Sequence, residues 1–321
     1  MIEEKLKKTS LLLDQPIKNY IDGSDVLYKA ALHLPSHGGK RLRPFLVIKS
    51  CEIVGGDTNY VIPAAIAVEL LHNFTLIHDD IMDNDLLRRG VPTVHTIWGI
   101  PMGILAGDLL FAKAFHILLS MKGDYERLIR AAEIMAKATI IISEGQSMDM
   151  SFEKRNDVSE EEYMTMIYKK TGALFEASAK IGAILGGGSG EMIECLGNYG
   201  KNLGIGFQIF DDYLGLVSKE EILGKPIGSD IREGKKTIFI IKLLNSSSRD
   251  KVINILGKKD ISNEDIASII YYIKNEKIDE YVLNKAKLHI DLAISSLSIF
   301  PNSEAKNDLI ELAKYAISRL K

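Results

Sequence analysis

Three aspartates fall close together in the segment LIHDDIMDNDLLRRG, Leu76 to Gly90. A helix would place Asp79 and Asp83 one turn apart on one face, with Asp80 beside them. Like charges this close repel and weaken a helix unless a cation neutralises them. Mg²⁺ typically binds one or two carboxylates and completes its octahedron with waters and phosphate oxygens. The segment therefore predicts a metal site for a phosphorylated substrate. The alternative is a solvated acidic helix end, which the apolar residues before it disfavour.

A second aspartate pair, Asp211-Asp212, lies in FQIFDDYLGL, residues 207–216. Gln208 precedes the pair by one helical turn. A surface pair of acids is the alternative here too. The apolar neighbours make that alternative weaker, because a helix surrounded by apolar side chains is expected to be buried.

Cations gather in the segment GGKRLRP, Gly38 to Pro44. Pro44 suits the first turn of a helix, and the two glycines expose backbone N–H groups before it. Lys40 and Arg43 are three residues apart, so both can face one anion near that helix start. A solvated basic loop is the alternative. The segment is not a Walker loop, which requires Gly-Lys-Ser/Thr.

Other cations could also bind phosphate. Arg88-Arg89 follow the first aspartates, where ordinary capping of a helix C-terminus is the alternative. Lys170 stands in an otherwise apolar segment. A loop rich in Gly and Pro, residues 223–237, carries Lys225 and Lys235 and is typical of a lid over an anionic substrate, or of a plain charged surface loop.

The elements that must position these residues are helices nearly throughout. The spacing of apolar residues predicts long helices over 60–88, 159–186 and 190–217, each carrying one of the segments above. Ile238 to Ile241 could form a strand by propensity, but the run is short and isolated, so we expect helix there. The fold class predicted is all-α, a large single-domain bundle around a deep central cavity.

Composition excludes several classes of protein. The net charge of −3 does not favour non-specific nucleic-acid binding. Cys51 and Cys195 have no metal-ligand spacing and are typical of reduced core residues in a cytosol. The N-terminus has no apolar segment typical of a signal peptide. Three ionisable residues interrupt the most apolar stretch, 100–121, which argues against a transmembrane helix.

Taken together and in order, GGKRLRP, LIHDDIMDNDLLRRG, GQSMD, YKKTGALFEAS, FQIFDD and LGKPIGSDIREGKKT resemble the trans-isoprenyl diphosphate synthases, the family of farnesyl and geranylgeranyl diphosphate synthases. The resemblance spans roughly residues 35 to 240. It implies a single polyprenyl synthase domain over 1–321, a homodimer, and three Mg²⁺ ions between two aspartate-rich helices. With the reduced cysteines, the expected location is cytoplasmic. The substrates implied are isopentenyl diphosphate and an allylic diphosphate: dimethylallyl, geranyl or farnesyl.

The resemblance also implies roles for individual residues. Those implied as metal ligands are Asp79, Asp80, Asp83 and Asp211. Those implied for the allylic diphosphate are Arg88, Lys170, Thr171 and Lys225, and those for isopentenyl diphosphate are Lys40, Arg43, His72 and Arg89. Gln208 and Lys235 are also expected to bind substrate. Many members have a third aspartate at the second site, where this sequence has Gly215. That glycine is familiar in archaeal geranylgeranyl-type members, so Asp211 is expected to do most of the metal binding there.

Product length is expected to depend on the residues that precede Asp79. Phe74 and Thr75 are the fifth and fourth residues before it, and family members that make C15 often have bulky side chains at both positions. Only Phe74 is large here, which favours a C20 product, with a C15 or a longer product as alternatives. Leu71 is expected to contribute to the same wall.

Three other functions compete with prenyl transfer. A terpene cyclase also has aspartate-rich metal sites, but it needs no second diphosphate site such as GGKRLRP. A non-catalytic partner subunit predicts eroded aspartates, and the first motif is complete. A plain helical scaffold gives no reason for aspartates in apolar helices.

Overall fold

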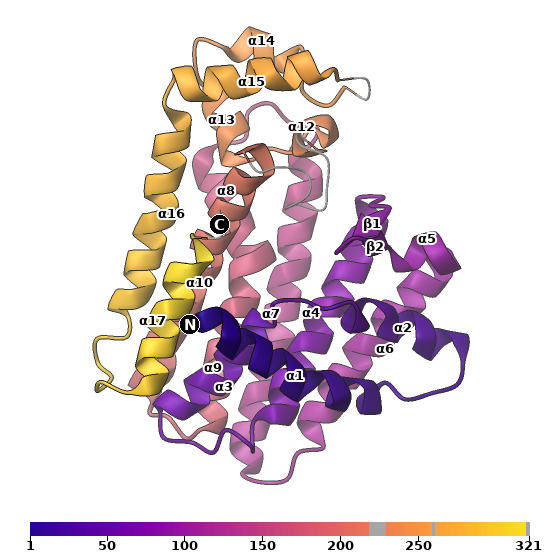
Figure 1. Cartoon of the computed structure of the whole chain (residues 1–321), viewed down its shortest axis with the longest axis vertical. Helices are drawn as coiled ribbons and strands as arrows, with labels where there is room; N and C mark the ends of the chain where they lie inside the picture. The colour runs from indigo at the N-terminus through magenta and orange to yellow at the C-terminus, as the bar shows by residue number, and fades with distance from the viewer. Residues whose placement is uncertain (218–228, 259–260, 319–321) are drawn as a thin grey trace. The chain divides into compact units, whose positions relative to one another are not determined.

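The structure is a computed structural model that describes residues 1–217, 229–258 and 261–318 (Figure 1). Its residues form two compact units. The first comprises 1–138, 174–200 and 296–312, and the second comprises 139–173, 201–295 and 313–321. The helices α7 (Tyr125–Phe152), α10 (Gly190–Val217) and α17 (Glu304–Ala316) contribute residues to both units.

The first unit is built around α4. Its elements are α1 (Ile2–Tyr20), α2 (Val26–Ser36), α3 (Leu42–Ile53), α4 (Ile62–Met82), β1 (Leu87–Arg88), β2 (Val91–Pro92), α5 (Val94–Trp98), α6 (Ile100–Leu119) and most of α9 (Ala173–Leu185). Residues 64–71 of α4 are all buried. The helix is apolar on several sides because it packs against both α3 and α6. The aspartates stand at the C-terminal end of this core helix.

The expected helix over 60–88 is too long at its C-terminal end. The α4 helix stops at Met82, and β1 and β2 form a hairpin beyond it (Figure 1). Arg89 and Gly90 connect the strands with positive φ values of 55° and 76°. Two positive φ values suit the tight turn of a two-residue hairpin. Pairs of strand residues this short leave no alternating pattern, so the sequence did not reveal the hairpin.

The second unit has its own apolar core. Its elements are α8 (Glu160–Ile167), η1 (Tyr168–Gly172), α12 (Ser229–Glu233), α13 (Ile238–Leu244), α14 (Arg249–Ile253), α15 (Asn263–Asn275) and α16 (Ile278–Ser295). Ser159 and Ser262 begin α8 and α15 with capping boxes. The run Ile238 to Ile241 lies in α13 and is buried in this core, which confirms the expected helix.

The helix expected over 159–186 contains a turn of π-helix. The turn η1 separates α8 from α9 and carries both Lys170 and Thr171. One extra residue in a turn rotates the side chains that follow it, and such bulges are frequent at functional sites. The sequence pattern alone does not distinguish a π-turn from α-helix.

One described helix, α6, is long and apolar enough to cross a membrane by length and composition. Core helices of other proteins pass the same test. Of its most apolar window, 39% is buried inside the protein, and α6 packs along α4.

Candidate functional site

The first group of aspartates, Asp79, Asp80 and Asp83, lies at the C-terminal end of α4. Asp83 is the C-cap residue, and its N–H donates to the carbonyl of Asp79 at 2.8 Å. Arg88, on β1, donates through Nε to Asp80 and through Nη2 to Asp85 Oδ2 at 3.2 Å. The same Nη2 lies 3.6 Å from Asp79 Oδ2. The hairpin therefore returns one arginine onto the carboxylates that end the helix.

Asp80 is the most buried of these aspartates, with 1% of its surface exposed. Burial raises the pKa of its carboxyl to about 6, although the Arg88 charge lowers it. The neighbouring carboxylates Asp85 and Asp79 raise the pKa further. A second positive charge near this group would relieve the same repulsion.

A basic cluster, made of Lys40, Arg43, His72 and Arg89, lies in the same unit. Arg43, in the first turn of α3, donates through Nη1 to His72 Nε2 at 3.1 Å, and its guanidinium stacks 4.4 Å from the centre of the Phe175 ring. Burial lowers the pKa of His72 well below its ordinary value, and the nearby arginines lower it further. His72 is therefore neutral at pH 7 and accepts this hydrogen bond, which orients the guanidinium.

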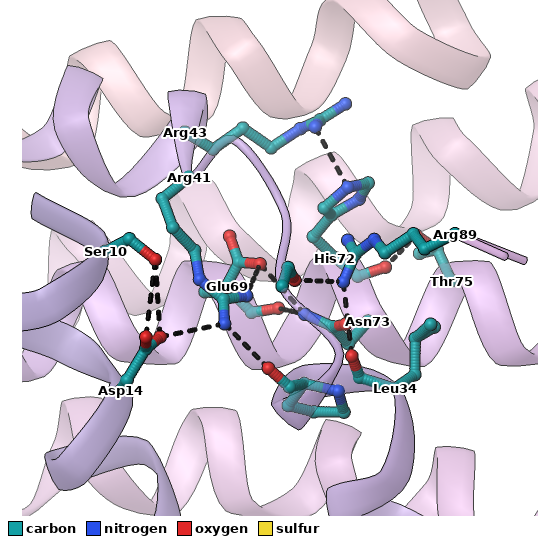
Figure 2. Close-up of polar contacts among 12 residues, drawn as sticks. Ser10, Asp14, Leu34, Arg41, Arg43, Glu69, His72, Asn73, Thr75 and Arg89 are labelled. Atoms are coloured by element: carbon teal, nitrogen blue, oxygen red, sulfur yellow. Dashed lines mark hydrogen bonds and ion pairs between the residues drawn. The ribbon is translucent and has the colours of Figure 1, made fainter. Parts of the chain in front are cut away.

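Arg89 completes this cluster from the hairpin turn. Its Nη1 donates to the carbonyl of Leu34 at 3.2 Å and to that of Gly38 (Figure 2). A Cβ at Gly39 would lie 3.0 Å from Arg89 Nη2, and Gly39 has a φ of +129°. The second glycine of GGKRLRP is thus required for the loop to pass close to Arg89. Lys40, next in the loop, is exposed.

The residues expected to set product length do not share one environment. The ring of Phe74 lies 5.3 Å from that of Phe111 on α6 and 4.8 Å from that of His78. Thr75 turns its hydroxyl onto the carbonyl of His72 at 2.7 Å. Leu71 is fully buried. Phe74 therefore contributes most to the aromatic surface between α4 and α6.

The second aspartate pair lies in the second unit, where a chain of hydrogen bonds fixes Asp212. Tyr163 donates to Asp212 Oδ2 at 2.7 Å, and Gln208 Nε2 donates to Asp212 Oδ1 at 2.9 Å. The Thr171 hydroxyl in turn donates to Gln208 Oε1 at 2.7 Å. Both oxygens of Asp212 therefore accept hydrogen bonds, one from Tyr163 of α8 and one from the preceding turn of α10. Asp211 is the member of this pair that is expected to bind metal.

Lys170 is held by α7. Its Nζ donates to Asp149 Oδ2 at 2.7 Å. Gly145 lies one turn before Asp149 in α7, and a Cβ there would lie 2.4 Å from the backbone N of Lys170. The segment GQSMD therefore supplies a glycine that lets η1 approach α7 and an aspartate that pairs with the lysine.

The basic loop is described only in part. Lys225 lies outside the described residues. Lys235 pairs with Glu233 Oε2 at 2.9 Å. Its neighbour Lys236 is 3% exposed and donates to the carbonyls of Glu153 and Gly234 at 3.1 and 2.8 Å.

Several residues at these clusters had no role in the sequence-based prediction. Arg41 and Glu69 form a buried pair beside the basic cluster, Asp85 contacts Arg88, and Tyr163 supports Asp212. Asp85 follows Asp83 closely and could have been included with the first group. The others pair with residues far along the chain, so no local spacing reveals them.

The donor set of these clusters fits Mg²⁺. In the described part of the chain, no group of three His, Cys, Asp or Glu side chains is already arranged as metal ligands. Mg²⁺ needs only one or two carboxylates when waters and substrate phosphates supply the other oxygens. Asp79 and Asp83 offer such a pair beside the buried carboxyl of Asp80, whose pKa is raised chiefly by burial.

Comparison with known proteins identifies the family. The model of the polyprenyl synthetase family matches residues 24–273. Geranylgeranyl diphosphate synthase of Saccharolobus solfataricus is 48% identical over 313 residues, which cover 95% of this chain and 94% of that protein.

Solved structures agree with that match. Geranylgeranyl pyrophosphate synthetase of Pyrococcus horikoshii superposes with a TM-score of 0.94 at 46% identity, covering 99% of this chain and 98% of that one. Polyprenyl synthase of Caulobacter crescentus, solved with calcium and isoprenyl diphosphate, has a TM-score of 0.92 at 31% identity, covering 100% and 97%. The family match, the relatives and the fold agree over nearly the whole chain, and the chain therefore belongs to the polyprenyl synthetase family.

Proposed function

We propose that this protein is a short-chain trans-prenyltransferase that condenses isopentenyl diphosphate with allylic diphosphates to make C20 geranylgeranyl diphosphate. The observation that carries the proposal is the near full-length identity of 48% to a geranylgeranyl diphosphate synthase. The motifs expected for both substrates are also present in order.

The proposed cofactor is Mg²⁺, with three ions when substrate is bound. The residues proposed to hold it are Asp79, Asp80 and Asp83 in the first unit and Asp211 in the second. When bound, the ions would supply Lewis-acid stabilisation of charge on the leaving diphosphate. The calcium in the Caulobacter crescentus polyprenyl synthase structure is consistent with a divalent cation in this family.

The basic cluster of the first unit is proposed to bind isopentenyl diphosphate. Arg43 and Arg89 present guanidinium groups that can form paired hydrogen bonds with phosphate oxygens. Lys40 adds an exposed cation at the start of α3. His72, which is neutral at pH 7, contributes a hydrogen bond rather than a charge.

The proposed reaction begins when the allylic C–O bond breaks and its electron pair leaves with the diphosphate. Cations stabilise this leaving group electrostatically. The residues proposed for that role are Arg88, Lys170 and Lys225, with Thr171, Gln208 and Lys235 also contacting the diphosphate. The double bond of isopentenyl diphosphate then attacks the allylic carbon and forms the new C–C bond. A proton is lost to the departing diphosphate, and the product regains its double bond.

The form in which the enzyme works is part of the proposal. We propose a homodimer that buries the apolar face of α6, where Ile100, Ile104 and Leu105 are 53%, 44% and 51% exposed. Apolar patches of this kind on soluble proteins often mark interfaces. We also propose a cytoplasmic location, because both cysteines are free thiols.

One experiment tests the proposed function. The purified protein is incubated with labelled isopentenyl diphosphate and, in turn, dimethylallyl, geranyl or farnesyl diphosphate, and the products are sized by chromatography. We expect C20 product from each primer with Mg²⁺ and none with EDTA. Turnover that persists in EDTA would refute the metal proposal, and C15 or C25 as the main product would refute the C20 assignment.

A further inference from the structure

Four segments of the first unit meet at one buried guanidinium, that of Arg41 (Figure 2). Arg41 precedes α3, and its Nη1 donates to Glu69 Oε1 of α4 at 2.6 Å. Its Nη2 donates to the carbonyl of Pro35 in α2 at 2.7 Å and to Asp14 Oδ1 of α1 at 3.2 Å. One side chain thus joins three helices to the loop of the basic cluster.

The pair formed by Arg41 and Glu69 is removed from water, with side-chain exposures of 1% and 2%. Burial lowers the pKa of Arg41, but the charge and hydrogen bond of Glu69, with those of Asp14, raise it above its ordinary value overall. The Arg41 guanidinium therefore stays charged at neutral pH. A buried ion pair is often no more stabilising than apolar residues of the same size. Stability alone is thus a weak reason for this one.

The backbone at Arg41 shows what the pair holds in place. Arg41 has φ of 48° and ψ of 37°, a left-handed conformation that is uncommon for residues other than glycine. Lys40 before it is exposed, whereas Arg41 is buried. The left-handed residue turns the chain so that Lys40 faces solvent and α3 begins with Arg43 in its first turn. The contacts of the Arg41 side chain compensate for the cost of that turn.

The same contacts adjoin the other members of the basic cluster. The carbonyl of Leu34 accepts from Arg89, and the carbonyl of Pro35, next in sequence, accepts from Arg41. Asn73 donates to Glu69 Oε1 at 3.0 Å, which fixes the carboxylate one turn before His72. The Arg41–Glu69 pair therefore contacts α2, which accepts a hydrogen bond from Arg89, and α4, which carries His72.

We propose that Arg41 and Glu69 are positioning residues that set the arrangement of Lys40, Arg43, His72 and Arg89 for isopentenyl diphosphate. This inference rests on the proposed function of that cluster. It differs from a purely structural role in one respect: losing the pair should weaken the use of isopentenyl diphosphate selectively, even when the protein remains folded.

The test compares Arg41→Lys, Glu69→Gln and the double variant Arg41→Met/Glu69→Gln with the wild type. The double variant removes both charges at similar volume, so neither charge is left buried alone. For it we expect little change in Tm, an increase on the order of tenfold in KM for isopentenyl diphosphate, and less than about a twofold change in KM for the allylic primer. Arg41→Lys, which keeps the charge, should recover part of the loss.

The control is Asp308→Asn, which removes a buried carboxylate that pairs with Lys5 and Lys49 elsewhere in the same unit. It should lower Tm and leave both KM values unchanged. If the folded double variant keeps a normal KM for isopentenyl diphosphate, or if both KM values rise equally, the positioning role is wrong while the proposed function stands. A wild-type protein that transfers no prenyl group would refute both.

Discussion

Arg88 pairs with Asp80, the most buried of the aspartates at the end of α4. Arg88 also lies near Asp79 and Asp85, so one guanidinium forms ion pairs with three carboxylates. A metal ion bound by Asp79 would compete with Arg88 for the same charge. The arginine would then be available for a phosphate oxygen, which is consistent with its proposed role.

The buried carboxyl of Asp80 predicts a pH dependence of stability. Its pKa rises from 3.8 to about 6 on folding, so the folded protein binds the proton more tightly than the unfolded chain does. Stability without metal should therefore decrease as pH rises through that interval. Melting curves recorded in EDTA should show this slope in the wild type and a smaller one in Asp80→Asn. Parallel curves for the two proteins would contradict the assignment.

Lys40 and Arg43 predict a selective defect in substrate use. Replacing either with Ala removes a charge-assisted contact worth about 1.5–3 kcal/mol. We expect KM for isopentenyl diphosphate to rise roughly tenfold or more, and KM for the primer to rise less. Steady-state kinetics with each substrate varied will measure this, with the exposed Lys122→Ala as control. Equal effects on the two substrates would show that the cluster does not favour isopentenyl diphosphate.

At the scale of elements, α4 carries residues of three proposed sites along its length. Glu69 lies beside the basic cluster, His72 belongs to it, Phe74 contacts α6, and Asp79 begins the end that is proposed to bind metal. The order is a consequence of helical rise, because each turn moves the next face about 5.4 Å along the axis. The distance between the basic cluster and the aspartates is therefore fixed by one rigid helix.

Phe74 predicts a change in product length. Truncating Phe74 to Ala removes a ring from the aromatic surface between α4 and α6, and apolar burial favours filling that space at about 0.8 kcal/mol per CH₂. Products should shift from C20 to C25 or longer, and Thr75→Phe should shift them towards C15. Chromatography of the dephosphorylated products measures both. An unchanged distribution in a fully active Phe74→Ala variant would place the control of length elsewhere.

The approach of α7 to η1 predicts a position that tolerates no side chain. In Gly145→Ala the new Cβ would lie 2.4 Å from the backbone N of Lys170, so η1 and its lysine must shift. We expect a lower Tm and a raised KM for the allylic primer, although alanine favours helix by about 1 kcal/mol. Gly197→Ala is the control, because its Cβ would meet the flexible side chain of Lys180. A Gly145→Ala variant that is as stable as the control would argue against the close approach.

At the scale of the whole molecule, the chain forms two compact units that share long helices. The basic cluster and the first aspartates belong to the first unit, and the second aspartate pair and Lys170 to the second. The prediction of a single domain over 1–321 stays a prediction. The exposed apolar residues of α6 belong wholly to the first unit.

The exposed face of α6 predicts an oligomer. Changing Ile104 and Leu105 to Glu should place charges in the proposed dimer interface and favour the monomer, because burying unpaired charges is costly. Light scattering coupled to size exclusion will give the mass of each species. A wild-type protein that is monomeric at micromolar concentration would refute the proposed dimer, as would a double variant that remains dimeric.

The sequence by itself determined the family, the all-α fold and the local groupings. Asp79 and Asp83 lie one helical turn apart at the end of α4, and helix geometry alone brings such residues together. Lys40 and Arg43 are also close in sequence, but Lys40 precedes the left-handed Arg41 and lies outside α3. The correct helix at Ile238 to Ile241 followed from the isolation of that run. The roles of these residues in substrate and metal binding remain predictions.

Only the tertiary structure decided which distant residues support those groups. Arg41 meets Glu69 across 28 residues of sequence, and Tyr163 meets Asp212 across 49. Such pairs depend on how helices pack, and neither residue carries a local signal of its partner. The end of α4 at Met82 was decided in the same way, because a short hairpin returns Arg88 to Asp80 and stabilises a break that helix propensity did not predict.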